Sequence, residues 1–498
     1  MIKDIKLKGF YAGLTLVIMT ASCTDLVTEE KDSLVRSTPQ GSNFTPGDPV
    51  QLLASAYTDL GAYNNQGNMW AMSEHPTAEL IPPTRGTDWG DNGVWRAYET
   101  HAWDATHPQL LDTWNILNQR SYKTNEILAS NPSATQAAEA KFLRAFYMFQ
   151  VLDYYGQVPF REVTQGINEL PRVLTRSEAF DFVVKDLEEA IPQLPSLAPS
   201  PMNGQASKAA AYFLLAKMYL NKAVYKSQKP EGPYTFEAAD MDKVVNYVDL
   251  IAKDGYSLDP KYFNSWTKEE GTEVIWSSTE GIPQNLWNCT LHYNMNPSGW
   301  NGFATLASFY DKFEDSDIRK GIAPKKDGTV YSGVGYGFLI GQQYNDKGEP
   351  ITDARSQKPL AFTRDVPLEG AATDKGIRVI KYHPAYVNRF VFFRFGQAFI
   401  MKAEALFRAG KLAEALTEVN KMRSVRGASL LTTLSNDDMF DEQAREMYWE
   451  GVARTNEIRF EKFTTGEGVV VKDAYRVIYP IPSAALVSNP NISQNQGY

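Results

Sequence analysis

The chain has 498 residues, of which 43% are hydrophobic and 22% are charged, as is typical of a folded protein with a sizeable core. Its net charge of −9 is spread along the sequence, which argues against a nucleic-acid-binding protein. With 2 cysteines and 5 histidines, the composition excludes a disulfide-rich scaffold, a zinc ribbon and an iron–sulfur cluster. The unusual feature is the 12% of aromatic residues.

The N-terminus has the pattern of an export signal. Lys3, Lys6 and Lys8 precede an apolar run at 9–21, which is too short to cross a hydrocarbon core of roughly 30 Å. Small residues then lead directly to Cys23, a pattern that resembles a bacterial lipobox. We therefore predict a lipoprotein signal peptide at 1–22, lipidation of Cys23 and a polar tether at 23–47. The alternative is an ordinary signal peptide followed by an incidental cysteine.

The first half of the chain is predicted to be mainly helical after residue 135. Apolar residues recur at spacings of three and four in 136–155, 175–193, 207–225 and 237–253. Thr175 or Ser177 and Ser207 are candidate N-caps of two of these helices, and Gly156 ends another.

The irregular regions lie between and before these helices. Residues 63–106 and 256–392 lose helical periodicity and are rich in turn-forming residues, with strand-like runs at Val274–Ser277 and Arg378–Tyr382. Helical periodicity returns at 395–409, 411–425 and 436–461. Helices of this length joined by short turns are similar to degenerate tetratricopeptide repeats, which usually bind a partner or serve as a scaffold.

Tryptophans gather in or beside the irregular regions. Nine of the 10 do so, and the exception is Trp449; the nine are Trp70, Trp89, Trp95, Trp103, Trp114, Trp266, Trp276, Trp287 and Trp300. This distribution differs from the one expected if tryptophan served only to pack helices together. Because functional residues concentrate on loops, the pattern favours a binding surface.

Several stretches together resemble the SusD/RagB family of Bacteroidetes nutrient-binding lipoproteins. They are AEAKFLRAFYMFQVLDYYGQVP (138–159), RSEAFDFVVKDLEEAIPQLP (176–195), ASKAAAYFLLAKMYL (206–220), RFGQAFIMKAEALFRAG (394–410), VNKMRSVRGA (419–428), REMYWEGVARTNEIRF (445–460) and YPIPSAALVSNPNISQNQGY (479–498). The resemblance implies a mostly α fold, in which tetratricopeptide-like helix pairs form a frame and an irregular, short-strand-rich face binds ligand.

The resemblance also implies a function and a partner. Such a protein is anchored by lipid to the outer membrane facing the exterior, captures an oligosaccharide and delivers it to a SusC-like TonB-dependent transporter. It implies N- and C-terminal SusD-like regions at 48–255 and 393–498, separated by an irregular insert at 256–392. A peptide ligand is the alternative, since some relatives handle peptides.

Candidate ligand contacts come from three stretches. Sugars offer flat C–H faces and many hydroxyls, so their sites combine aromatic rings with polar side chains. The first stretch (82–95) is also similar to an RGxDW stretch in SusD-like sequences, while 285–302 and 382–396 supply further aromatic and polar groups. The candidates are Arg85, Asp88, Trp89 and Trp95; Trp287, Asn288, Cys289, Tyr293 and Trp300; and Tyr386 and Arg389.

Other chemistries have weaker support. Residues 333–337 (GVGYG) are not followed by an amphipathic helix, and 314–317 (EDSD) lack the spacing of a calcium loop, so we expect no cofactor. No serine elbow, HExxH motif or Cys–His pairing indicates an enzyme, although a carboxylate pair of a glycosidase has no sequence signature. Charged residues near 445–459 are interpreted as salt-bridged helix faces.

Overall fold

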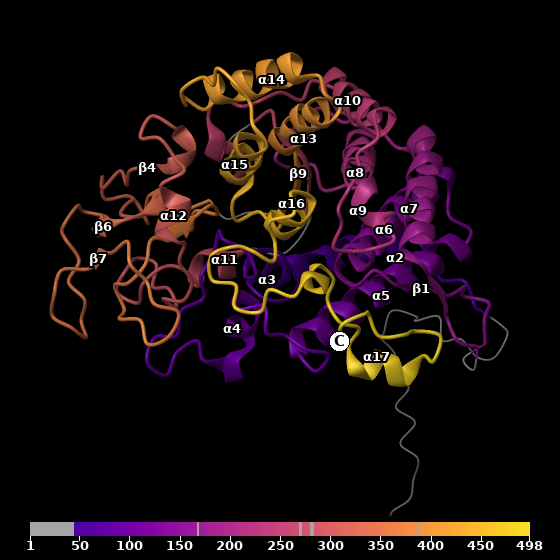
Figure 1. Ribbon diagram of the computed structural model, residues 1–498, viewed down its shortest axis with the longest axis horizontal. Coiled ribbons are helices and arrows are strands. Elements are labelled where there is room, and N and C mark those ends of the chain that lie inside the picture. Colours follow the sequence, from indigo (N-terminus) through magenta and orange to yellow (C-terminus); the bar gives the residue numbers. More distant parts are fainter. Residues whose placement is uncertain (1–43, 167–168, 268–270, 279–282, 387–388) are drawn as a thin grey trace, which may run out of the picture. The chain divides into compact units, whose positions relative to one another are not determined.

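The computed structural model describes residues 44–166, 169–267, 271–278, 283–386 and 389–498 (Figure 1). The expected signal peptide, Cys23 and most of the expected tether lie outside these ranges. Within them, no helix combines the length and the apolar character that a membrane span requires.

A succession of antiparallel helices forms the frame. These helices are α2 (Pro49–Thr58), α5 (Pro108–Ala129), α6 (Ala134–Tyr155), α7 (Arg176–Ala190), α8 (Lys208–Leu220), α10 (Ala238–Lys253), α13 (Phe395–Arg408) and α14 (Leu412–Val425). Neighbours pack in the order α5, α6, α7 and then α8, α10, α13, α14 (Figure 1). The mostly α class is confirmed, and all six helices expected between 136 and 425 are present to within a few residues at their ends.

Local sequence explains where the frame helices begin. Ser133 and Gln136 form a capping box at the start of α6, and Thr175 and Glu178 form another at the start of α7. Ser207 caps α8, whose buried alanines allow neighbouring helices to approach closely.

Two parts of the helical prediction were wrong. Helices α2 and α5 were missed, although Pro49 and Pro108 in their first turns and the apolar spacing at Leu110, Trp114 and Leu117 of α5 are helix signals. The single helix expected at 436–461 is two helices, α15 (Asn436–Met447) and α16 (Ala453–Arg459). The chain turns between them, where Trp449 and Gly451 have φ angles of 60° and 76°.

Short elements occupy the two irregular regions, the C-terminal part of the chain after α16 and the ends of three frame helices. The short α-helices are α3 (Asn68–Glu74), α4 (Val94–Glu99), α9 (Lys222–Tyr225), α11 (Gln284–Asn288), α12 (Ala307–Tyr310) and α17 (Ser483–Ser488). The 3₁₀ helices are η1 (Asp59–Tyr63), η2 (Asp91–Gly93), η3 (Ile191–Gln193), η4 (Tyr262–Trp266), η5 (Ile318–Lys320) and η6 (Ala474–Val477).

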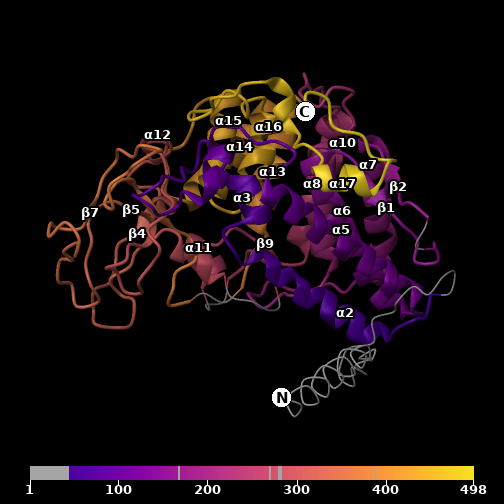
Figure 2. The same ribbon diagram turned by 90° about the horizontal axis from the view of Figure 1, so that it is seen from below.

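The described strands pair antiparallel in four small sheets. They are β1 (Val158–Phe160), β2 (Arg172–Leu174), β3 (Val274–Ser277), β4 (Gly321–Ile322), β5 (Tyr336–Leu339), β6 (Gly341–Gln342), β7 (Ala361–Phe362), β8 (Arg378–Ile380) and β9 (Val391–Arg394). The pairings are β1–β2, β3–β9, β4–β5–β8 and β6–β7, with bulges in β3–β9. Both strand-like runs expected in the insert are therefore strands, and β4–β7 lie on the opposite side from α5, α6 and α7 (Figure 2).

Most tryptophans of the irregular regions are core residues, contrary to the expectation from their distribution. Those exposed by less than a tenth are Trp70, Trp95, Trp103, Trp114, Trp266 and Trp276, together with Trp449. Short, irregular elements have few side chains per turn with which to exclude water, and large aromatic rings fill the space between them. Trp89 and Trp287 are half-buried, and Trp300 is 41% exposed.

A buried charge network joins the insert to the C-terminal helices. We define it as Glu273, Asp317, Arg319, Lys381, Arg394, Arg423, Arg426, Glu442, Glu446 and Glu450, all linked by ion pairs of 3.2 Å or less. Glu446 at its centre accepts hydrogen bonds from Arg394 (2.7 Å), Arg426 (2.8 Å) and Arg319 (3.2 Å). The charges near residue 445 thus form buried pairs between elements, in addition to pairs along one helix.

The arginines decide the ionisation of these acids. Burial alone raises the pKa of Glu446, but Arg426, Arg394 and Arg319 outweigh burial and hold that pKa well below its usual range. In the same way, Arg319, Arg445 and Arg423 outweigh burial and lower the pKa of Glu442 to about 2. Both carboxylates therefore stay charged and paired at neutral pH.

Replacing the central carboxylate should strongly destabilise the fold. In Glu446→Gln, three buried guanidinium groups lose their shared negative partner, and the free energy of unfolding should fall by about 3–5 kcal/mol. The measurement is urea unfolding followed by circular dichroism. The control is Asp315→Asn, because Asp315 pairs with Lys320 at 2.6 Å with its side chain 99% exposed and should leave stability unchanged. Equal stability of the two variants would contradict a structural role for the network.

A second group of buried acids should make the fold less stable as the pH rises. Burial raises the pKa of Glu74 and of Glu457 to about 8 in each case, and both lie close to the C-terminal segment. The folded chain therefore keeps protons that the unfolded chain has lost above about pH 4.5. The stability they contribute should fall as the pH rises from about 4.5 to 8, by up to about 1.4 kcal/mol per pH unit for each group. Urea titrations of Glu74→Gln should show a flatter fall than the unchanged chain, and an identical slope would refute this assignment.

Candidate functional site

Two tryptophans from distant parts of the sequence lie side by side at the surface. Trp89 precedes η2, and Trp300 follows α11 in the insert. Their ring centroids are 6.4 Å apart, their planes are inclined by 46°, and the Trp89 indole N–H donates to the carbonyl of Trp300 at 3.0 Å. The hydroxyl of Tyr293 donates a hydrogen bond to Asp88, the residue before Trp89. We call Trp89, Trp300 and Tyr293 the aromatic platform.

The segment that carries Trp300 is folded tightly on itself. The carbonyl of Cys289 accepts hydrogen bonds from the backbone N–H groups of Gly302 and Phe303, both at 2.8 Å. Gly302 also leaves room for Trp89, because a Cβ at Gly302 would lie 2.3 Å from the indole ring. A glycine is therefore required at residue 302 for the observed position of Trp89.

Arg85 holds the loop that carries Trp89. Arg85 and Asp88 exchange backbone hydrogen bonds of 3.0 and 3.1 Å across a tight turn, after which Trp89 adopts a φ of 63°. The buried Arg85 guanidinium donates to three carbonyls, those of Gly302 (3.2 Å), Ala372 (2.5 Å) and Lys375 (2.8 Å). Burial lowers the pKa of Arg85 to about 10, so it stays charged. In this structure Arg85 clamps three loops and does not face solvent.

Polar groups border the platform. The Tyr293 hydroxyl donates to Asp88 at 2.7 Å, and burial together with the Asp88 carboxylate raises the pKa of Tyr293, which keeps its proton. Arg355 lies with its guanidinium carbon 4.4 Å from the Tyr293 ring centroid and 4.0 Å (Nη1) from the Asp88 carboxylate. Its side chain is 63% exposed and can donate hydrogen bonds to a ligand.

The sequence analysis did not identify Arg355. Its loop is set by the buried Asp353 carboxylate, which accepts from the Arg355 backbone N–H at 3.0 Å and from the Ser356 hydroxyl at 2.8 Å. The Ala354 N–H donates to the Asn294 side chain at 3.1 Å, which ties this loop to the Tyr293 segment. The Asp-Ala-Arg-Ser sequence indicates a turn, but it gives no sign that the turn lies beside residues 60 positions earlier.

Two of the expected contacts lie beneath the platform. Trp95 is buried, donates to Asp91 at 2.5 Å and packs against Phe303, with 5.4 Å between ring centroids. Phe303 in turn lies 4.6 Å from the Trp89 ring. Cys289 is fully buried, and burial raises the pKa of its thiol. Trp95 and Cys289 therefore support the platform from below and are not offered to an external ligand.

The remaining candidates are divided between the platform and other places. Asn288 is half-buried, and its carbonyl accepts from the Trp300 N–H at 2.6 Å. Trp287 packs against a separate apolar cluster of Leu291, Met295, Val334, Leu339, Leu360, Phe362 and Ile380. Tyr386 lies beside His383, with 5.9 Å between ring centroids, while Arg389 donates to the carbonyls of Met202 and Ser278 at 3.3 Å. The structure therefore brings Asp88, Trp89, Tyr293, Trp300 and Asn288 together. Tyr386 and Arg389 instead contact His383, Met202 and Ser278, which do not belong to the platform.

The acidic motif at 314–317 is engaged by cations of the protein. Glu314 pairs with Arg423, Asp315 with Lys320 and Asp317 with Arg319. Across the part of the chain that the structure describes, no three His, Cys, Asp or Glu side chains are arranged to hold a metal ion.

Comparisons with known proteins find similarity to SusD-like proteins. A family model described as SusD-like, "Starch-binding associating with outer membrane", matches residues 45–220. The starch-binding protein SusD of Bacteroides thetaiotaomicron is 24% identical, and the alignment covers 99% of each chain.

Solved structures share the fold. A laminarin-binding SusD-like protein has a TM-score of 0.68 at 18% identity, covering 90% of this chain and 99% of the other. Surface glycan-binding protein A of Bacteroides thetaiotaomicron, in complex with laminarihexaose, has a TM-score of 0.64 at 18% identity. The alignment covers 90% of this chain and 98% of the other.

Adding a methyl group at Gly302 should displace Trp89. In Gly302→Ala the new Cβ overlaps the indole ring, so the loop must shift, at an expected cost of about 1–3 kcal/mol in the free energy of unfolding. Near-ultraviolet circular dichroism should show a changed tryptophan signal. Gly90→Ala is the control, because a Cβ at Gly90 meets nothing within 4 Å and its φ is −71°. An unchanged spectrum in Gly302→Ala would contradict the observed position of Trp89.

Proposed function

We propose that the chain is a SusD-like protein that captures an oligosaccharide on the aromatic platform without altering it chemically. The observation that carries the proposal is the inclined pair of Trp89 and Trp300 with polar groups at its edge. Relatives named for starch and laminarin binding support a glycan as the ligand class.

The chemistry of the platform suits a sugar chain. The exposed parts of two indole rings can cover the C–H faces of sugar rings, and because the planes are inclined by 46° they suit successive sugars that are not coplanar. Asp88 accepts hydrogen bonds from hydroxyls, whereas Arg355 donates to them. Burial of a hydroxyl between a donor and an acceptor gives specificity, because a sugar without that hydroxyl leaves both groups unpaired.

Four of the described acids with raised pKa values are too deeply buried to serve as the general acid of a glycosidase. Burial raises the pKa of Glu74, Glu79, Glu99 and Glu457, and a raised pKa is a property of a general acid. However, each of these residues is exposed by only 5% or less. A polysaccharide cannot reach these four carboxyl groups in this fold.

Location and partner follow from the same family. We propose that Cys23 is lipidated, that the protein sits on the outer membrane facing the exterior, and that it passes its ligand to a SusC-like TonB-dependent transporter. The lipobox-like N-terminus and the outer-membrane description of the matching family model support this proposal. A peptide ligand is the second candidate, carried only by the resemblance of the sequence to the SusD/RagB family.

Removing either platform tryptophan should weaken glycan binding. A panel of oligosaccharides and peptides identifies a ligand, and calorimetry then compares variants. Trp89→Ala and Trp300→Ala should each cost about 1–3 kcal/mol, or roughly 5- to 150-fold in Kd. Tyr212→Ala on α8 is the control, because this half-buried tyrosine belongs to the frame and should leave the affinity unchanged. Unchanged affinity in both tryptophan variants would refute the platform as the binding site, and binding of peptides alone would favour the second candidate.

A further inference from the structure

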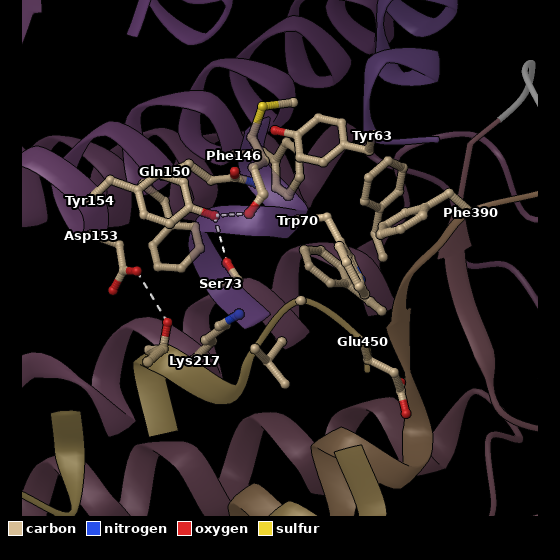
Figure 3. Close-up of a pocket in the computed structure, with 17 residues that line it drawn as sticks. Tyr63, Trp70, Ser73, Phe146, Gln150, Asp153, Tyr154, Lys217, Phe390 and Glu450 are labelled. Carbon is tan, nitrogen blue, oxygen red and sulfur yellow. Dashed lines mark hydrogen bonds between the residues drawn. The ribbon is translucent and has the colours of Figure 1, made fainter. Parts of the chain in front are cut away.

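A small internal chamber lies where the frame, α3, β9 and the C-terminal segment meet. It has a volume of about 60 Å³ and is lined by Trp70 and Ser73 of α3, Gln150 of α6, Lys217 of α8, Phe393 of β9 and Gly451, among others. Figure 3 shows the side chains of Trp70, Ser73, Gln150 and Lys217 converging on one space. None of the platform residues lines it, and the packed rings of Trp70, Phe303 and Trp89 connect the two.

The chamber contains a cation without a carboxylate partner. Among the described residues, the Lys217 ammonium forms no ion pair; it lies 5.2 Å from the centroid of the Phe149 ring, and the Asp153 carboxylate attracts it without a direct contact. Figure 3 shows the Lys217 nitrogen pointing into the chamber, below Ser73. Burial lowers the pKa of Lys217 to about 8, so the ammonium remains mostly charged at neutral pH and requires hydrogen-bond acceptors.

The two acids that line the chamber are already engaged by other groups. Asp153 accepts from Tyr225 (2.7 Å), Arg454 (2.8 Å) and Thr455 (3.1 Å). Glu450 accepts from Lys381 at 2.6 Å and from Arg394 at 2.7 and 2.8 Å. Their pairing with other cations leaves the ammonium of Lys217 to be satisfied by something inside the chamber.

Two further polar atoms in the chamber wall lack hydrogen-bond partners: one is a donor and the other is an acceptor. The Trp70 indole N–H is buried without an acceptor, and the Gln150 side-chain oxygen is buried without a donor. An anion would satisfy Lys217 and Trp70, but it would face the lone pairs of Gln150 and the carboxylates of Asp153 and Glu450. Water can donate and accept, so it can satisfy all of these groups.

We propose that the chamber is a binding site for a cluster of ordered water molecules, with the Lys217 ammonium as its charged anchor. A volume of about 60 Å³ holds on the order of two to four waters, since each requires at least about 10–15 Å³ and has a share of about 30 Å³ in the liquid. The cluster bridges α8 and α6 of the frame to Trp70 of α3.

The position of the cluster gives it a structural consequence. The Trp70 ring stacks on Phe303 at 6.4 Å with planes inclined by 19°, and Phe303 lies 4.6 Å from Trp89. The waters therefore hold one end of an aromatic column whose other end supports the platform. The proposal does not depend on the identity of the ligand that the platform binds.

Crystallography of the full mature chain tests the site directly. We expect water peaks at hydrogen-bonding distance from the Lys217 nitrogen, the Trp70 indole nitrogen and the Gln150 oxygen. A parallel crystal soaked in bromide should show no anomalous peak in the chamber. A dry chamber would overturn the proposal, and so would a bromide peak, which would mark an anion site.

A solution measurement covers the case in which variants fold poorly. The Trp70 indole proton of the unchanged chain should show a nuclear Overhauser effect to long-lived water, assigned by its loss in Trp70→Phe. In Lys217→Met the number of bound waters should fall, whereas Lys185→Met, which changes a surface lysine with a 75% exposed side chain, should leave the cluster intact. The same waters in the Lys217→Met crystal would overturn the role of the ammonium as anchor.

Discussion

The shared carboxylate of Glu446 is the constraint on which the arrangement of the molecule depends. It is fully buried on α15, and its partners come from three separate stretches: Arg319 of the insert, Arg394 at the end of β9 and Arg426 after α14. Burying these charges is costly unless each is paired with good geometry. These ion pairs connect the irregular insert, the end of β9 and the segment after α14 to α15, so the network ties the insert to the helical frame.

The frame could be predicted from sequence because its signals are local. A helix needs only its own apolar spacing and caps, so α6, α7, α8, α10, α13 and α14 were found to within a few residues at their ends. The break between α15 and α16 was missed because it depends on distant partners. Gly451 and Val452 donate their N–H groups to the buried Glu74, at the end of α3, in place of helical carbonyls. No periodicity within 436–461 records that contact.

The candidate site was predicted only in part, for the same reason. Residue type and loop context pointed to Trp89, Tyr293 and Trp300, which the fold does bring together. The same reasoning could not separate exposed tryptophans from buried ones, because Trp95 and Trp276 occur in equally turn-rich sequence and are packed inside. Arg355 was missed because only the folded insert places it over Tyr293. Clustering of tryptophan therefore indicates both partly exposed rings at the surface and the core beneath them.

The way in which Arg85 holds the platform has a consequence for how such a surface can diversify. Its guanidinium binds the main-chain carbonyls of Gly302, Ala372 and Lys375, and every amino acid supplies a carbonyl. Side chains on these loops can therefore change while the clamp persists, except at Gly302, where only glycine leaves room for Trp89. A mount of this kind, which depends mainly on main-chain carbonyls, allows the side chains of the platform to change while the frame stays the same.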